Sequence, residues 1–464
     1  MNKLQSLDGM RPEVDLIREV FHYQSRFEGG VMVFKIDYPV TEDPGFPGLL
    51  KDLALLAKTG FKVVIVPGAK EHIDTVLRQH DIETSYFDNS SDIFSDIPVR
   101  LTTSKAIPYV EMAAFNVASQ FMTFLSGSRV EALIGNFVRA RGVGVINGID
   151  TGHTGTVDKI YADSLRKVLN LGMIPILPCI GWSPSGKPYN VPSDEIALAV
   201  SKELSAIKLF IISVNDGSAA KNLNLNIEEK GVSLEMLETR QNGSIIKLSP
   251  SQTKALIKAN PKPPLEANQL LRELILAMMA SQAGVNRIHI IDGREEGVIL
   301  KELFSNLGIG TMVYTDEYDS IRALHSRDLP DILRLMEPLM QSGILIRRSA
   351  EQIQINKADY SVLEIDGSVR ACGALHDWGE RQGEIAAVAT DPQYTALGLG
   401  RKIVGYLIEK ARKIKMRRVF VLTTQTQDWF ESLGFKEVAV DSLPEQKCKV
   451  YDHNRKSKIF ALEL

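Results

Sequence analysis

The segment Ala386–Lys402 (AAVATDPQYTALGLGRK) has residue types and spacing that could hold a phosphate group. An apolar strand leads into a loop with Gly398 and Gly400, and a helix is predicted to begin at Arg401. Glycines just before a helix leave its first backbone N–H groups uncovered, and the helix dipole adds partial positive charge there. Strand–glycine–helix turns also occur for steric reasons alone. The motif by itself therefore indicates a pyrophosphate site without defining one.

The elements that must position this loop form an α+β domain over residues 319–464. A polar linker, Tyr314–Ser320, precedes it, and the alternating strands within it are joined by a hairpin turn at Asp366–Gly367. The predicted strands are Ile321–His325, Tyr360–Ile365, Arg370–Leu375, Glu384–Thr390 and Arg418–Thr423, and the predicted helices are Asp328–Met340 and Arg401–Ile414.

Residues 1–318 have a different pattern, in which apolar strands alternate with helices. Continuous β-branched strands joined by helices indicate an α/β fold with a mostly parallel sheet sandwiched by helices. The expected strands are Gly30–Ile36, Phe61–Val66, Met173–Leu177, Lys208–Val214, Arg287–Ile291 and a closing Gly308–Val313, and the expected helices are Phe46–Thr59, one from Glu71, Asp194–Leu204 and Gln269–Ala283.

The composition and the lack of a signal or membrane-spanning segment favour a soluble cytoplasmic protein. The 464 residues predict two or three domains, and 54 basic against 57 acidic residues leave a net charge of −3. We therefore expect no binding to nucleic acid or membranes, and the basic run Lys410–Arg418 should complement a helix C-terminus. No apolar run approaches the roughly 18 residues of a membrane span. Three distant cysteines and eight histidines without ligand spacing predict neither disulfides nor a metal site.

The glycine loop, the strand before it and the helix after it resemble the acetyl-CoA segment of the GNAT acetyltransferases. Val419–Phe435 (VFVLTTQTQDWFESLGF) resembles the end of that fold, and Ile321–Ala323 resembles its first strand. This match covers residues 319–464. Thr395 stands where the family has Arg or Gln, which affects a side-chain contact and leaves the backbone cradle unchanged.

Further stretches resemble one GNAT branch, the bacterial N-acetylglutamate synthases. They are, in chain order, Val63–Asp74, Gly135–Phe137, Ser193–Ala197, Gly297–Thr311, Gly343–Ser349 (GILIRRS), Cys372–Leu375, Gly383–Val388 (GEIAAV), Leu422–Thr424, Trp429–Phe430, Leu443–Glu445 and Tyr451–Ser457 (YDHNRKS). The resemblance implies an amino-acid-kinase-like domain over 1–318, regulatory or oligomerising, followed by a GNAT N-acetyltransferase domain over 319–464.

The resemblance implies acetyl-CoA as co-substrate and no metal. Backbone N–H groups near Ala387 and Val388 would meet the thioester oxygen as it becomes an oxyanion, and the glycine loop would hold the pyrophosphate. The positions that match cofactor contacts are Ala387, Val388, Ala389, Leu397, Gly398, Leu399, Gly400 and Arg401.

Glu384 matches the position of the family's general base. The substrate amine is protonated at neutral pH, and it must lose a proton before it attacks a thioester. Glu380 is a nearby rival, and a surface Glu at a strand end is the structural alternative. Thr423 matches a hydroxyl residue that could orient the amine or assist the departing thiolate; an ordinary strand threonine is the alternative. Cys372 lies in mid-strand and is expected in the core.

Arg348, Arg455 and Ser457 match the family's glutamate-binding positions. Glutamate carries two carboxylates, and guanidinium groups offer the fork geometry that suits them. Arg347 adjoins Arg348 and could exchange roles with it. A solvated basic surface is the alternative for the C-terminal cluster.

The first domain is not expected to transfer phosphate. Kinases of this fold use a glycine turn after the first strand, whereas this chain has Lys35-Ile36-Asp37-Tyr38, with an acid that would repel phosphate. The resemblance implies a homo-oligomer and L-arginine as a candidate inhibitor, with contacts between Gln269–Ala283 and the Asp292–Gly297 turn. The chain departs from the family pattern at Asn260–Pro264.

The resemblance implies an amino-acid N-acetyltransferase that converts acetyl-CoA and L-glutamate to N-acetyl-L-glutamate and CoA, the first step of arginine biosynthesis. The amine would attack directly within a ternary complex. Two alternatives remain open: a GNAT enzyme acting on another amino acid, and a non-catalytic regulator whose domains only bind ligands.

Overall fold

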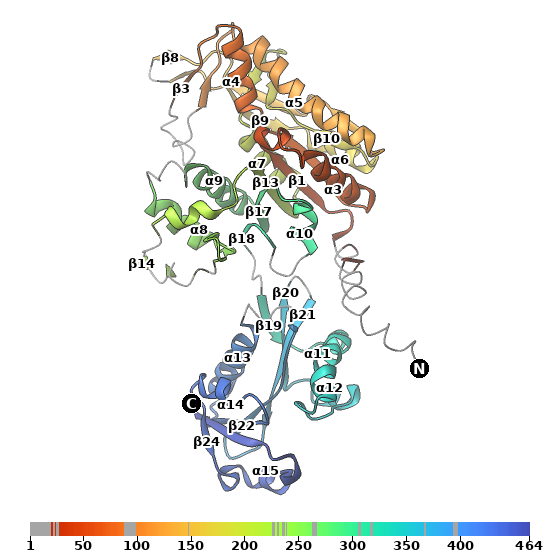
Figure 1. Ribbon diagram of the computed structural model, residues 1–464, viewed down its shortest axis with the longest axis vertical. Helices are drawn as coiled ribbons and strands as arrows, with labels where there is room; N and C mark the ends of the chain where they lie inside the picture. Colours follow the sequence, from red (N-terminus) through yellow and green to blue (C-terminus); the bar gives the residue numbers. More distant parts are fainter. Residues whose placement is uncertain are drawn as a thin grey trace. The chain divides into compact units, whose positions relative to one another are not determined.

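The computed structural model describes the chain apart from a few segments, and it divides the chain into two compact units, residues 1–316 and 317–464 (Figure 1). The described residues are 20–21, 24, 27–87, 99–146, 148–224, 228–229, 232–233, 237, 239–261, 267–304, 308–315, 319–365, 368–392 and 398–464. Residues 316–318, next to the domain boundary expected from the sequence, lie outside these ranges, as does the expected hairpin turn at 366–367.

The first unit is built on an eight-stranded sheet whose neighbouring strands are parallel, except that β17 and β18 are antiparallel. The closing strand expected at 308–313 therefore runs against its neighbour. In spatial order the strands are β16 (Lys247–Leu248), β18 (Thr311–Tyr314), β17 (Arg287–Asp292), β13 (Lys208–Ser213), β1 (Val31–Ile36), β2 (Lys62–Pro67), β10 (Ile174–Ile176) and β5 (Ala132–Ile134).

Helices cover both faces of this sheet, and the residues of β1 alternate between the two cores. Met32 and Phe34 pack on one side, whereas Val33 packs on the other, as the two-residue period of a strand requires. One side holds α3 (Phe46–Lys58), α4 (Lys70–Gln79), α5 (Ile107–Gly127) and α10 (Val298–Phe304); the other holds α6 (Ala162–Asn170), α7 (Ser193–Glu203), α8 (Pro250–Ala259) and α9 (Asn268–Gln282).

Several elements of this unit were not predicted from the sequence. The helix α5 is apolar over most of its circumference, so no single helical stripe stands out in its sequence. A second, four-stranded sheet contains β12 (Pro188–Asn190), β11 (Ile180–Trp182), β6 (Val138–Gly142) and β9 (Gly155–Ile160). Shorter elements are α2 (Tyr38–Thr41), β3 (Ser85–Phe87), β4 (Val99–Leu101), β7 (Val145–Ile146), β8 (Ile149–Asp150), η2 (Ser218–Asn222), β14 (Glu228–Glu229) and β15 (Val232–Ser233).

The second unit is a seven-stranded mixed sheet with helices on both faces. The helices α11 (Leu329–Gln341) and α12 (Ala350–Ile355) pack on one face, and α13 (Leu399–Lys413) and α14 (Gln427–Glu431) on the other. The strands, in spatial order, are β19 (Asp319–Ala323), β20 (Tyr360–Ile365), β21 (Ser368–Asp377), β22 (Gln382–Thr390), β23 (Arg418–Thr423), β25 (Lys458–Glu463) and β24 (Lys436–Val438). Short helical turns are η4 (Ser326–Asp328), η6 (Val440–Ser442), α15 (Glu445–Lys449) and η7 (His453–Arg455).

Both expected fold classes are confirmed: an α/β unit with a largely parallel sheet between helices, then an α+β unit. Within the described ranges, no helix is long and apolar enough to cross a bilayer.

Candidate active site

Strand β22 separates from its neighbour β23 just after Glu384, while it stays paired with β21. Its parallel pairing with β23 covers only Gln382–Glu384, against Arg418–Phe420. On its other side, the register with β21 shifts, and Ala387 adopts φ 53°, which is costly for a residue with a side chain. Backbone groups of β22 are therefore turned out of regular pairing, as a strand needs if its N–H groups are to contact a ligand.

The helix α13 begins directly after a left-handed glycine. Gly398 is the N-cap at φ 61°, and the helix starts at Leu399, two residues before the expected Arg401. A Cβ on Gly400 would lie 3.2 Å from Cζ2 of Trp429, so a side chain there would crowd the first turn. The first N–H groups of this helix carry the partial positive charge that favours a phosphate.

The other expected cofactor positions divide into backbone and side-chain candidates. The Leu399 side chain is buried in the core, so only its backbone can meet a ligand, and Arg401 is exposed with Nη2 3.5 Å from the Ser432 hydroxyl. Ala387 and Ala389 are also buried, which again leaves their backbone groups. Leu397 and Thr395 lie outside the described residues.

Glu384 is a buried carboxylate, 6% exposed, held by two donors. Lys447 Nζ lies 2.7 Å from Oε2, and Trp378 Nε1 donates to the same oxygen at 2.8 Å. Among the described residues, no hydrogen bond reaches Oε1. The carboxylate of the nearby Glu380 accepts the backbone N–H of Glu445 at 3.3 Å, at the start of α15.

Arg348 and Arg455 come from distant segments and lie in one electrostatic environment with Glu384. Arg455 donates to the carbonyls of Gly343, at 3.2 Å, and Ile344. Burial lowers the pKa of Arg455, the charge of Arg348 lowers it further, and Asp452 and Glu384 act in the opposite direction. The two guanidinium groups thus repel each other unless an anion lies between them.

The neighbouring residue Arg347 is exposed, whereas Arg348 is half-buried. Arg348 also faces Tyr360, whose pKa is raised by burial and lowered in part by that positive charge. Of the two adjacent arginines, Arg348 is therefore the one that belongs to the same region as Arg455.

Thr423 and Ser457 are brought close by the sheet, because Thr423 pairs with Lys458 in the register of β23 and β25. The Thr423 hydroxyl accepts the N–H of Thr426 at 3.0 Å and lies 2.8 Å from its hydroxyl. Ser457 is buried, and its carbonyl accepts the Tyr451 hydroxyl at 2.6 Å. Thr423 therefore closes the turn after β23, and its hydroxyl shares a hydrogen bond with the Thr426 hydroxyl in which either group can donate.

The sequence analysis did not single out Lys447 or Trp378, which both contact Glu384. A lysine in a five-residue helix and a tryptophan after a strand carry no distinctive spacing, so no local signal marks them. Cys372, expected in the core, is fully buried, and burial raises the pKa of its thiol to about 12. A thiol that is so hard to ionise is a poor nucleophile.

The lysine of the Lys35-Ile36-Asp37-Tyr38 turn is paired with two carboxylates in the first unit. Lys35 Nζ lies 2.6 Å from Asp37 and 2.8 Å from Asp194. Burial alone would lower the pKa of Lys35, but Asp194 and Asp37 together raise it well above its ordinary value. The ammonium group is thus neutralised within the chain.

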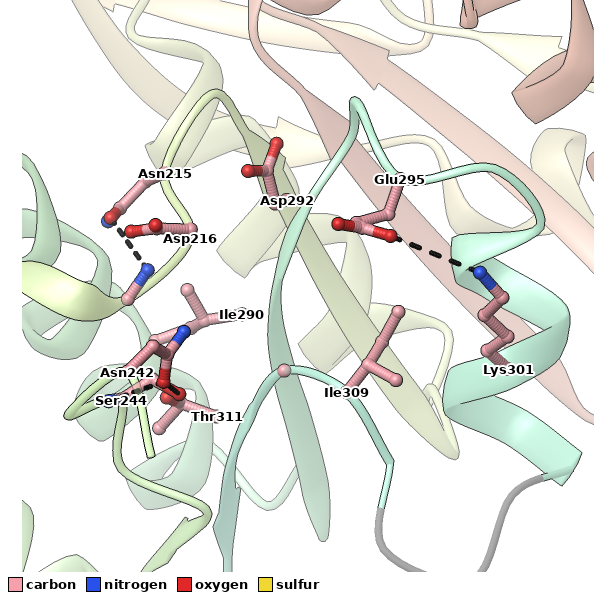
Figure 2. A pocket seen from close by; sticks show the side chains of 12 residues that line it. Asn215, Asp216, Asn242, Ser244, Ile290, Asp292, Glu295, Lys301, Ile309 and Thr311 are labelled. Atoms are coloured by element: carbon pink, nitrogen blue, oxygen red, sulfur yellow. Dashed lines mark hydrogen bonds and ion pairs between the residues drawn. The ribbon is translucent and has the colours of Figure 1, made fainter. Parts of the chain in front are cut away.

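A cavity of about 220 Å³ lies in the first unit, at the ends of β13 and β17 (Figure 2). Three carboxylates, Asp216, Asp292 and Glu295, make it acidic, although Lys301 lies 3.9 Å from Glu295. Its remaining lining consists of Asn215, Gly217, Asn242, Ser244, Ile290, Ile309, Gly310 and Thr311. The Asp292–Gly297 turn contributes to this lining, whereas α9, within the described residues, does not.

The parted strand, the glycine-capped helix and the buried carboxylate define a GNAT-class N-acetyltransferase joined to an amino-acid-kinase-fold unit. Consistent with this, residues 40–259 match the amino acid kinase family and residues 329–435 match the acetyltransferase (GNAT) family. Amino-acid acetyltransferases from Edwardsiella ictaluri and Escherichia coli are 32% and 30% identical to this chain. The first alignment covers 95% of this chain and 96% of the Edwardsiella protein. The second covers 97% of this chain and 98% of the Escherichia coli protein. The chain therefore belongs to the amino-acid acetyltransferase family.

Solved structures give the same relationship. N-acetylglutamate synthase from Neisseria gonorrhoeae, complexed with coenzyme A and L-arginine, matches with a TM-score of 0.79 and 31% identity, over 97% of this chain and 99% of that chain. A structure of the same enzyme with coenzyme A and N-acetyl-glutamate matches with a TM-score of 0.58 over the same shares. The expected two-part architecture and the enzyme class are confirmed.

Proposed function

We propose that this protein transfers the acetyl group of acetyl-CoA to the amino group of L-glutamate, giving N-acetyl-L-glutamate and CoA at the start of arginine biosynthesis. The observation that carries the proposal is the grouping of Glu384, Arg348 and Arg455 in one region of the GNAT unit. A base and two guanidinium groups match an amine with two carboxylates. The related Neisseria enzyme, seen with coenzyme A and N-acetyl-glutamate, supports this choice.

Each group has a defined part in the reaction. Glu384 removes a proton from the ammonium group, directly or through water, and the free amine attacks the thioester carbon. The C–N bond forms, backbone N–H groups of Ala387 and Val388 stabilise the oxyanion, and the C–S bond breaks as the tetrahedral intermediate collapses. Thr423, whose hydroxyl is paired with that of Thr426, gives a proton to the departing thiolate and takes up, through water, the second proton that the nitrogen loses as the amide forms.

Acetyl-CoA would be held by backbone groups at the β22 bulge, with its pyrophosphate at the N-terminus of α13 near Gly398, Gly400 and Arg401. Arg348, Arg455 and Ser457 would bind the glutamate carboxylates. With amine, thioester and base in one ternary complex, no acyl-enzyme is needed, which agrees with the buried Cys372.

The test is CoA release by the full chain with a panel of acceptors: L-glutamate, L-glutamine, L-aspartate, L-ornithine and L-lysine. We expect turnover with glutamate and a drop of at least tenfold with glutamine, because one carboxylate is lost. Preference for another amino acid would favour a GNAT enzyme of different specificity. Absence of CoA release with every acceptor, despite acetyl-CoA binding, would favour a non-catalytic regulator.

We also propose that L-arginine binds the acidic cavity of the first unit and inhibits the enzyme. Asp216, Asp292 and Glu295 suit a guanidinium group, and a related enzyme has been seen with L-arginine. The Arg294 side chain now donates to both oxygens of Asp292, at 2.6 to 3.2 Å, so an incoming guanidinium must compete with it. Calorimetry with L-arginine, and with L-citrulline as the uncharged control, tests this; equal binding of the two, or none, would contradict it.

Two further proposals concern the first unit. The carboxylates around Lys35 support loss of phosphoryl transfer, so ADP formation dependent on N-acetylglutamate should be absent. We propose a homo-oligomer, to be checked by light scattering after gel filtration. The cytoplasmic location stays a prediction.

A further inference from the structure

The short helix α15 carries a lysine into the neighbourhood of the proposed base. The Lys447 side chain is 10% exposed and that of Glu384 is 8% exposed, and Nζ and Oε2 are 2.7 Å apart. Nζ also lies 4.6 Å from the centre of the Trp378 ring, whose own N–H donates to Glu384. The side chains of Lys447, Trp378 and Glu384 thus each contact the other two.

Both donors act on the same carboxylate oxygen. Two hydrogen bonds at 2.7 and 2.8 Å from different directions fix the plane of the carboxylate as well as its position. This arrangement leaves Oε1 as the oxygen that can accept a proton. A carboxylate without such contacts could rotate, and Oε1 would then have no fixed position.

We propose that Lys447 is a positioning residue for acetyl transfer: it fixes Oε2 of Glu384 and places its positive charge against the carboxylate, so that Oε1 faces the proton of the substrate amine. This inference rests on the proposed function, in which Glu384 is the base. Lys447 itself does not need to touch substrate or cofactor.

Other charged groups also face Glu384. His376 stands opposite Glu384 in the register of β21 and β22, and its Nδ1 lies 2.7 Å from Asp359. Arg455, on η7, contributes positive charge from another direction. Among the residues that the structure describes, neither of these groups hydrogen-bonds to the Glu384 carboxylate, whereas Lys447 contacts it directly.

The experiment compares the full-length wild type with Lys447→Met, Lys447→Arg and Lys449→Met, measuring kcat and KM for both substrates from pH 6 to 9.5. Lys449 lies on the same short helix but is 68% exposed and pairs with Glu445, so it is a matched control. We expect Lys447→Met to lower kcat about 10- to 100-fold at pH 7, the size expected for a charged hydrogen bond. In a plot of kcat against pH, the fall on the acidic side (the acidic limb) should begin at a higher pH in Lys447→Met than in the wild type, because the carboxylate has lost a neighbouring positive charge. The decrease in kcat relative to the wild type should therefore become smaller as the pH rises. Lys447→Arg should keep the limb in place.

A merely structural lysine would give a different result. Lys447→Met would then lower thermal stability and leave the acidic limb where it is in the wild type, which would overturn the proposal. Since removal of one member of a buried ion pair can prevent folding, the neutral double variant Glu384→Gln with Lys447→Met provides a second test.

The double variant isolates the route by which Lys447 acts. If it acts only through Glu384, adding Lys447→Met to Glu384→Gln should change kcat by less than threefold. A further loss of tenfold or more, with normal acetyl-CoA affinity, would show an independent function and overturn the proposal. Failure of the wild type to acetylate glutamate would instead refute the proposed function; the same pH comparison can then be made with whichever amine it does acetylate.

Discussion

The positive charges of Arg348 and Arg455 repel each other in the folded protein. Arg348 follows α11, whereas Arg455 lies on η7, near the end of the chain. Burial adds to the cost, and it lowers the pKa of Arg455. Two partly desolvated guanidinium groups are expected to face each other where an anion is to be bound between them. The folded protein thus keeps an unfavourable electrostatic interaction that an anion bound between the two groups would relieve.

Arg455→Ala should raise the KM for glutamate about 10- to 100-fold, because a charge-assisted contact is worth roughly 1.5–3 kcal/mol. The KM for acetyl-CoA should stay within twofold of the wild type. Initial-rate kinetics with each substrate varied will separate the two. Arg347→Ala, at the exposed neighbour of Arg348, is the control and should change neither constant. Equal effects of Arg455→Ala on both substrates would show that Arg455 does not contact glutamate.

Glu384→Gln keeps the size of the side chain but cannot accept a proton. Loss of a general base typically costs 10²–10⁴-fold in rate, and here the loss should fall on kcat. It should shrink as pH rises, because more amine is then already deprotonated. A pH–rate series checks this, with Glu380→Gln as the control near α15. A kcat within a few-fold of wild type from pH 7 to 9 would remove Glu384 from the mechanism.

Gly400→Val should weaken acetyl-CoA binding about tenfold or more without changing the KM for glutamate. Its side chain would meet Trp429 at 3.2 Å or closer and displace the first turn of α13. Gly405→Ala is the matched control, because it lies in the same helix with nothing within 4 Å of a new Cβ. Isothermal titration with acetyl-CoA measures the effect. Unchanged affinity in Gly400→Val would place the pyrophosphate elsewhere.

Arg294→Ala should tighten L-arginine binding several-fold, because it frees Asp292 for the ligand. The Asp292 carboxylate raises the pKa of Arg294, as a close ion pair does, with Asp216 and Asp43 adding to the effect. Inhibition curves for wild type and variant check this, with the exposed Arg78→Ala as control. Weaker inhibition of Arg294→Ala would show that Arg294 helps to bind the ligand.

Glu273→Gln should change how the stability of the first unit depends on pH. Burial raises the pKa of Glu273 from 4.5 to about 7. Since the folded state then binds the proton more tightly, the contribution of Glu273 to stability is greatest below about pH 4.5 and is lost as the pH rises to about 7, by roughly 3 kcal/mol in total.

Glutamine does not titrate, so the wild type should lose stability relative to Glu273→Gln between pH 5 and 8. Calorimetric unfolding of the first unit measures the difference, and the exposed Glu83→Gln should follow the wild type. Parallel curves for wild type and Glu273→Gln would contradict the shifted pKa.

The sequence by itself determined the elements whose side chains follow a clear period, and through its motifs the family. The strands at β1, β2, β13 and β17 were predicted to within a residue or two at each end, because their apolar runs are continuous. The glycine loop before α13 could also be recognised from the sequence, because the backbone there needs glycine locally: Gly398 adopts a left-handed conformation that other residues rarely adopt.

Only the tertiary structure decided which residues meet. It placed Lys447 and Trp378 beside Glu384 and Glu380 at the start of α15, left Arg347 exposed and Arg348 half-buried, and gave Ala387 its positive φ. The physical reason is that periodicity reports burial within one element, whereas these contacts join segments distant in the chain through packing and charge. Whether a carboxylate caps a helix or remains available as a base depends on what the rest of the fold places beside it.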